Sequence, residues 1–244
     1  MPRFFINKEN ISEDVARLVG PDAFHIARSL RMAVGDGITL SDGEGFDYEA
    51  VLEDIKDEEC IARITEKRES NTEPRSEITL YMAYPKGDKL ETVVQKAVEL
   101  GAARIIPFIS SRCIKRPAED KADKQTARLN KIAQEAAKQC GRGRLPAVFK
   151  TRSVKQLCEE LCDYSLVLFC YEGKGTVSLK SVLEASEAPG SIAVIVGSEG
   201  GFSPEEAEIL VEKGALAVNL GPRILRCETA PDYVLSALSY RFEL

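Results

Sequence analysis

The chain has 244 residues, of which 44% are hydrophobic and 30% charged, with a formal net charge of −6 at pH 7. Its length suits one or two domains with a sizeable core, and its composition is ordinary for a globular protein. No window approaches the roughly 18 consecutive apolar residues of a membrane span, and the start MPRFFINKEN lacks the apolar segment of a signal peptide. We therefore expect a cytoplasmic protein with no membrane partner.

Residues 1–70 have the pattern of a small β-rich domain. Apolar and polar residues alternate in FDYEAVLEDI and CIARITEK, and the turn DGEG (Asp42 to Gly45) separates GITLS from FDYEAV. DAFHIARSL predicts one short helix. The following residues, 71–77, are polar, contain Pro74 and show no apolar periodicity, which indicates a linker.

Residues 78–244 predict a second domain in which strands alternate with helices. Strand-like apolar runs are ITLYMAY, RIIPFI, SLVLFC, SIAVIVG and LAVNLG. KLETVVQKAVEL places five apolar residues on one helical face before Gly101, and a long polar helix is expected from Asp123 to Cys140. This alternation predicts an α/β fold with a parallel sheet, whose ligands bind beyond the carboxyl ends of the strands.

The charge is unevenly distributed along the chain. Residues 1–72 hold 9 Lys and Arg against 16 Asp and Glu, whereas residues 112–155 hold 13 against 4. A basic block of +9 inside an acidic chain produces a localised field of the kind that binds a polyanion. A solvated helix face with unbalanced charge explains the same pattern equally well.

The cysteines predict no metal site and no disulfide framework. Their number is seven, there is no CxxC motif, and His25 is the only histidine. Cys158 and Cys162 are spaced i,i+4 on an expected helix, but nothing completes a ligand set. We expect free thiols.

Three loops follow three of the predicted strands: YEGKG (Tyr171 to Gly175), VGSEGGFSPEE (Val196 to Glu206) and LGPRILRCETA (Leu220 to Ala230). If the strands are neighbours, these loops form one pocket. The paired glycines Gly200 and Gly201 either make a tight turn or let the backbone approach a ligand. Ser203, Pro204 and Glu206 predict a capped helix start, and GSEGG matches neither GxGxxG nor a Walker A motif.

The motifs VGSEGGFSPEEAE and LGPRILRCETAPDYVLSAL, in this order, resemble the RsmE family of S-adenosylmethionine-dependent methyltransferases. PRFF, HIARSLRMAVGD, YPKGDKLETVVQKAVELG and RLNKIAQEAAKQCGR extend the resemblance over nearly the whole chain. The family belongs to the knotted SPOUT superfamily and methylates N3 of one uridine, U1498 in the decoding region of 16S ribosomal RNA. The chain departs from the family pattern at Ser198, where Pro is usual, at Cys227, where Thr is usual, and at its YRFEL end.

The resemblance implies a PUA-like first domain, a second domain with a carboxyl-terminal trefoil knot, and a homodimer. It also implies a bent S-adenosylmethionine held by the three loops. The implied cofactor-binding residues are Tyr171, Glu172, Gly197, Ser198, Glu199, Gly200, Gly201, Leu220, Gly221, Ile224, Leu225, Arg226 and Thr229.

The implied partner is the small ribosomal subunit, with RNA phosphates contacted by basic residues. The candidates are Arg3, Arg28, Arg31, Arg112, Lys115, Arg116, Arg128, Arg142, Arg144 and Arg223. Because uracil N3 carries a proton, transfer needs a base or a stabilised uridine anion. Arg226 is the candidate for stabilising negative charge, Glu199 is either the base or an organiser of its loop, and His25 is interpreted as structural or RNA-facing.

Two alternatives stay open. A related knotted methyltransferase would act on a ribose hydroxyl or a transfer RNA base. A non-catalytic RNA-binding protein of the same fold would need no cofactor pocket.

Overall fold

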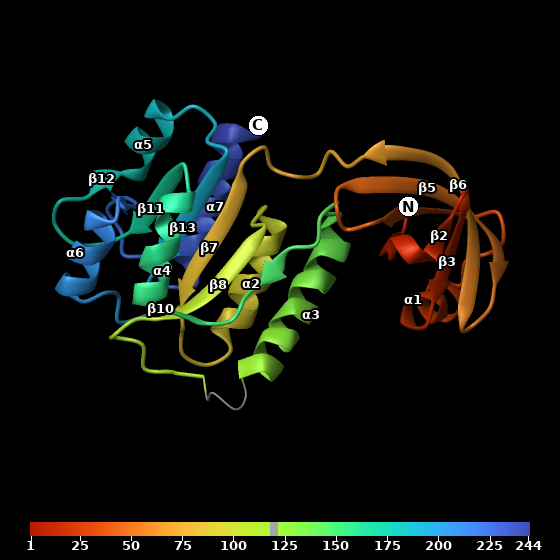
Figure 1. The fold of residues 1–244 in the computed structure, drawn as a ribbon, viewed down its shortest axis with the longest axis horizontal. Coiled ribbons are helices and arrows are strands. Elements are labelled where there is room, and N and C mark those ends of the chain that lie inside the picture. The colour runs from red at the N-terminus through yellow and green to blue at the C-terminus, as the bar shows by residue number, and fades with distance from the viewer. Residues whose placement is uncertain (118–121) are drawn as a thin grey trace. The chain divides into compact units, whose positions relative to one another are not determined.

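The computed structural model describes residues 1–117 and 122–244, which divide into two units (Figure 1). The first unit comprises residues 1–73 and 137–145, and the second comprises residues 74–136 and 146–244. Residues 70–76 lie outside helices and strands. The first unit thus includes residues 137–145 from the middle of the chain. The expected first domain, residues 1–70, is one continuous stretch and leaves this segment out.

The first unit is built on a six-stranded sheet in the order β1-β4-β5-β6-β3-β2. Only the β1–β4 pair is parallel within this sheet, and the other pairs are antiparallel. The strands are β1 (Arg3–Phe5), β2 (Ile11–Ser12), β3 (Val15–Val19), β4 (Gly37–Ser41), β5 (Phe46–Ile55) and β6 (Glu59–Glu69). The predicted short helix is present as α1 (Pro21–Phe24), which continues as a π-helical turn over His25–Ser29.

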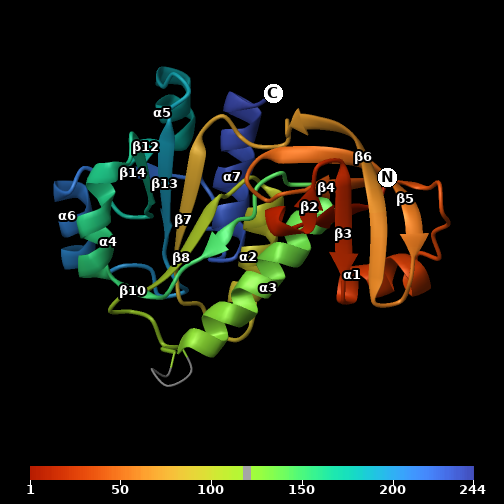
Figure 2. The same ribbon diagram turned by 45° about the vertical axis from the view of Figure 1, so that its right-hand side comes forward.

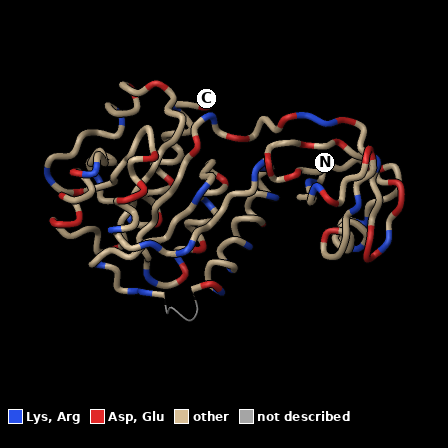
Figure 3. The backbone as a smooth tube through the Cα atoms, in the orientation of Figure 1, with Lys and Arg blue, Asp and Glu red and all other residues tan. Residues whose placement is uncertain are grey.

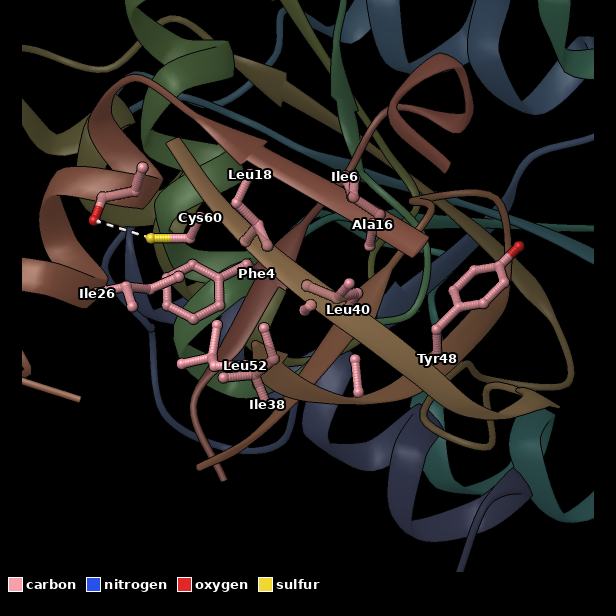
Figure 4. Close-up of a cluster of buried hydrophobic side chains, with 13 residues drawn as sticks. Phe4, Ile6, Ala16, Leu18, Ile26, Ile38, Leu40, Tyr48, Leu52 and Cys60 are labelled. Carbon is pink, nitrogen blue, oxygen red and sulfur yellow. Dashed lines mark hydrogen bonds between the residues drawn. The ribbon is translucent and has the colours of Figure 1, made fainter. Parts of the chain in front are cut away.

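Alternating residues of these strands build the core of the first unit (Figure 4). Leu40 and Leu52 are fully buried, as is Ile26 from the π-helical turn. The Cys60 thiol donates a hydrogen bond to the carbonyl oxygen of Ala23, 3.8 Å away. The period-2 pattern of the sequence therefore corresponds to one buried face of a sheet.

Buried ion pairs also stabilise the first unit. The guanidinium of Arg142, 4% exposed, donates to the Glu73 carboxylate at 2.7 Å, and the backbone N–H groups of Gly143 and Arg144 donate to the same carboxylate. Arg3 donates to the almost fully buried Asp47 and to the carbonyl oxygen of Arg142, at 3.1 Å. These contacts join the segment 137–145 to the rest of the unit.

The second unit contains an eight-stranded parallel sheet in the order β10-β8-β7-β13-β11-β14-β12, with β9 paired to β8. Its strands are β7 (Glu77–Ala83), β8 (Arg104–Ile109), β9 (Ala147–Val148), β10 (Arg152–Ser153), β11 (Leu166–Cys170), β12 (Val177–Ser178), β13 (Ser191–Val196) and β14 (Leu216–Asn219). The neighbouring strands β13, β7 and β8 are seen in Figure 2. The predicted parallel α/β fold is therefore confirmed.

Successive residues of β7 and β13 are buried whichever face of the sheet they point to. Helices therefore cover both faces of this sheet. The helices of the second unit are α2 (Lys89–Glu99), α3 (Ala122–Cys140) up to residue 136, α4 (Val154–Glu160), α5 (Leu179–Ala185), α6 (Pro204–Glu212) and α7 (Thr229–Phe242). Helices α2 and α5 contact α7, and α4 contacts α6 and β8. The five apolar residues predicted on one face of α2 are all buried. Among the helices that the structure describes, none combines the length and the hydropathy that a membrane-spanning helix needs.

We predict that Arg142→Ala destabilises the protein by about 3 kcal/mol, because it leaves the largely buried Glu73 carboxylate without its cation. Burial raises the pKa of Glu73, but hydrogen bonds from Arg142 and the backbone outweigh burial and lower it. The advantage of the native protein over the variant is therefore complete above the ordinary carboxyl pKa of about 4.3 and is lost as the pH falls below it.

Urea unfolding followed by circular dichroism measures this effect. The control is Arg116→Ala, which removes an exposed arginine. Equal unfolding midpoints for the two variants would show that the buried pair contributes nothing.

Candidate functional site

The loops that follow β11, β13 and β14 line one cavity of about 860 Å³ in the second unit. These three strands are neighbours in the sheet, and parallel strands bring their carboxyl ends to one edge. The volume lies within the range of small-molecule sites. The predicted convergence of the three loops is therefore present in the structure.

The structure brings together nearly all of the residues predicted to bind a cofactor. Tyr171, Glu172, Gly197, Ser198, Glu199, Gly200, Gly201, Leu220, Gly221, Ile224, Leu225 and Arg226 all line the cavity. Thr229 is the exception, since it begins helix α7 and is not a lining residue.

The structure explains the adjacent glycines Gly200 and Gly201 in two different ways. Gly201 has a φ of +63°, and its N–H donates to the carbonyl oxygen of Ser198 at 2.9 Å, which closes a turn. A Cβ on Gly200 would lie 2.9 Å from the backbone oxygen of Arg112. The chain's own turn and packing therefore account for both glycines, and close approach to a ligand stays a prediction.

The amino-terminal end of helix α6 is already occupied by the chain's own carboxylate. Ser203 and Glu206 form the predicted capping box. Glu206 also accepts hydrogen bonds from the N–H and the hydroxyl of Ser111, at 2.6 and 2.8 Å. A helix start that holds a carboxylate repels a phosphate, so the cavity suits a ligand without one.

Lys89 connects two acidic residues from different cavity loops. Its ammonium lies 3.0 Å from Glu199 and 3.1 Å from Glu228. Burial raises the pKa of Glu199, but hydrogen bonds from Lys89 and from the Lys86 N–H outweigh this effect and lower it. A carboxylate with a lowered pKa is a weak base, so the geometry favours the interpretation of Glu199 as an organiser of its loop.

Ser198 and Cys227, the two departures from the family pattern, are both buried beside the cavity. The Ser198 hydroxyl has no hydrogen-bond partner among the described residues. Burial, a hydrogen bond to Glu228 and the nearby Glu199 charge raise the pKa of Cys227 to about 12. Cys227 is therefore a neutral thiol at physiological pH. All seven cysteines are free.

Arginines form the cationic part of the cavity. Arg112, Arg223 and Arg226 are exposed lining residues. Within the part of the chain that the structure describes, no carboxylate lies within 4.0 Å of their guanidinium groups, although Arg112 donates to the carbonyl oxygen of Gly200. Their charge is thus available to an anionic partner.

Lys and Arg occur along both units of the chain (Figure 3). The other predicted RNA-binding residues differ in their surroundings. Arg28 and Arg128 are exposed but paired with Asp57 and Glu91, and Lys115 donates to the carbonyl oxygen of Gly87. The remaining exposed members are Arg31, Arg116 and Arg144. Arg3 and Arg142 are largely buried in the ion pairs of the first unit, which gives them a structural role and keeps their guanidinium groups from RNA phosphates.

One further cavity residue, Lys89, was not assigned from the sequence, and His25 was interpreted there as structural or RNA-facing. Lys89 lines the cavity from the start of α2. The segment YPKGDKLETVV, which contains Lys89, resembles the family pattern, but it does not show which carboxylates this lysine contacts. His25 is exposed in the first unit, where its ring lies edge-on to Phe4 at 6.1 Å. It does not line the cavity. The described residues contain no group of three metal-ligating side chains.

Comparison with known proteins gives consistent matches over both units. A family model described as an RNA methyltransferase domain matches residues 71–239, and one described as an RNA methyltransferase PUA domain matches residues 18–65. Ribosomal RNA small subunit methyltransferase E of Bacillus subtilis (strain 168) is 37% identical over 251 residues, covering 100% of this chain and 98% of that protein.

Two solved structures are also similar to this chain. Ribosomal RNA small subunit methyltransferase E from Neisseria gonorrhoeae, bound to S-adenosyl methionine, has a TM-score of 0.86 and 31% identity, with coverage of 98% and 97%. A methyltransferase from Legionella pneumophila, in complex with the same cofactor, has a TM-score of 0.85 and 31% identity, with the same coverage.

We predict that Cys227 resists alkylation. With a pKa of about 12 and a buried sulfur, it is almost entirely protonated at pH 8, so it should react at least about tenfold more slowly than an exposed thiol. Iodoacetamide labelling followed by peptide mass spectrometry measures the rates, with the exposed Cys162 as the internal reference. Labelling of both cysteines at one rate would contradict the buried, neutral thiol.

Proposed function

The chain belongs to the ribosomal RNA small subunit methyltransferase E family, and we propose that it methylates N3 of one uridine of 16S ribosomal RNA, U1498, with S-adenosylmethionine as the methyl donor. The observation that supports the proposal best is the cavity formed by the three loops of the family motifs. Two relatives with 31% identity are solved with this cofactor bound.

The cavity suits S-adenosylmethionine on physical grounds. It has the volume of a small-molecule site, and its lining mixes apolar side chains such as Ile224 and Leu225 with polar groups. The cofactor has no phosphate, which agrees with the helix α6 start that Glu206 already occupies. The buried Ser198 hydroxyl is an unpaired polar group beside the cavity. When bound, the cofactor supplies a methyl group on a sulfonium, which becomes a neutral thioether on transfer.

Arg226 has the charge that the acceptor requires. The proton of uracil N3 passes to solvent water, negative charge develops on N3 and the neighbouring carbonyl oxygens, and this charge is lost again as N3 forms its new bond to the methyl carbon. An exposed guanidinium in the cavity can donate hydrogen bonds to such an oxygen. Glu199, held by Lys89, keeps its loop in place. Uridine anion stabilisation by Arg226 is therefore favoured over proton removal by Glu199.

The exposed arginines are the proposed phosphate contacts. Arg112 and Arg223 flank the same cavity as Arg226, so RNA held by them would present a base to it. A uridine must leave its stack to enter a cavity. The homodimer and the trefoil knot implied by the family resemblance stay predictions, and sedimentation velocity would test the first.

We predict that the purified protein transfers radiolabelled methyl groups from S-adenosylmethionine to small ribosomal subunits that lack the modification. Digestion of the RNA and identification of the nucleoside should give 3-methyluridine. Label on a ribose or on another base would show that the protein methylates a different position from the one proposed. No label on subunits or on free RNA would favour the non-catalytic interpretation.

We predict that Arg226→Ala lowers turnover about 100-fold, the usual effect of removing one donor that stabilises a developing anion, and lowers cofactor affinity much less. Arg75→Ala is the matched control, because Arg75 is an exposed arginine of the second unit that does not line the cavity. Single-turnover rates and calorimetric cofactor binding separate the two effects. An unchanged rate for Arg226→Ala would remove this residue from the mechanism.

A further inference from the structure

Lys89 occupies an unfavourable position for helix stability. It is the first residue of α2, and a cation at the amino-terminal end of a helix is opposed by the helix dipole. Its ammonium points instead to two carboxylates outside the helix. The stability of α2 therefore does not account for a lysine here, whereas the carboxylate contacts do.

The two carboxylates come from separate parts of the cavity wall. Glu199 lies in the loop after β13, and Glu228 lies between β14 and α7. Their oxygens are 3.0 and 3.1 Å from one nitrogen, so they lie no farther apart than the sum of these distances. Two carboxylates this close repel each other unless a cation lies between them.

Glu199 and Glu228 also accept hydrogen bonds from residues other than Lys89. The Glu199 carboxylate accepts a hydrogen bond from the Lys86 N–H at 3.2 Å, and Glu228 accepts one from the Cys227 thiol at 3.2 Å. One ammonium thus connects the segment after β7 with two of the three loops that form the cavity.

We propose that Lys89 is a positioning residue for cofactor binding: its ammonium holds Glu199 and Glu228, and through them the loops after β13 and β14, in the arrangement that receives the cofactor. The inference rests on the proposed function, since it concerns the same cavity. Lys89 acts through the two loops and takes no part in the methyl transfer itself.

The test measures S-adenosylmethionine binding by calorimetry, with four variants compared with the native protein. Lys89→Met should weaken binding about tenfold, because the two carboxylates then repel and the loops separate. Lys89→Arg keeps the cation and should bind within about twofold of the native protein. Adding Glu228→Gln to Lys89→Met removes the repulsion and should restore most of the lost affinity.

Lys96→Met is the matched control. Lys96 lies on the same helix and pairs at 2.9 Å with Asp232 of α7, but it does not line the cavity. This variant should bind the cofactor as the native protein does. In the cofactor-free proteins, amide hydrogen exchange of residues 197–203 and 220–228 should be faster in Lys89→Met than in Lys96→Met.

Each outcome decides one proposal. If the native protein does not bind the cofactor, the proposed function itself is wrong. If the native protein binds and Lys89→Met binds equally well, the positioning role is overturned. A loss of affinity that Glu228→Gln does not relieve, or that Lys96→Met shares, would also overturn it, because the loss would then come from general damage to α2.

Discussion

The parallel pairing of β13, β11 and β14 is the constraint on which the rest of the site depends. Parallel strands end at one edge of the sheet, so three segments that are distant along the chain deliver their loops to one place. Burial on both faces keeps β11 and β13 in the interior of the unit. The cavity is thus a consequence of strand order.

The exposed arginines and the paired acidic residues of the cavity loops have different roles. The arginines Arg112, Arg223 and Arg226 are exposed at the cavity, where they can meet an anionic polymer. Glu199 and Glu206 are instead bound by the chain's own groups: Glu199 by Lys89, and Glu206 by its helix start and by Ser111. These two carboxylates therefore maintain the loop structure, whereas the three arginines have no carboxylate partner among the described residues.

The same division appears in the first unit, whose net charge is negative. Arg3 and Arg142 neutralise buried carboxylates there and bind the segment 137–145 to the sheet. A count of basic residues along the sequence does not distinguish such structural cations from those that face solvent. Burial decides the matter, because a guanidinium that lies largely buried against a carboxylate is not accessible to a phosphate.

The sequence by itself determined the alternation of strands and helices, the capping box at Ser203, the buried face of α2 and the family to which the chain belongs. These features are local, since period, capping residues and contiguous motifs are written in neighbouring positions. Only the tertiary structure decided that Lys89 bridges Glu199 and Glu228, that Arg3 and Arg142 are buried, and that Gly200 packs against the Arg112 backbone. Each of these contacts joins residues far apart in the chain, so its partner is set by strand order and packing, which no local pattern encodes.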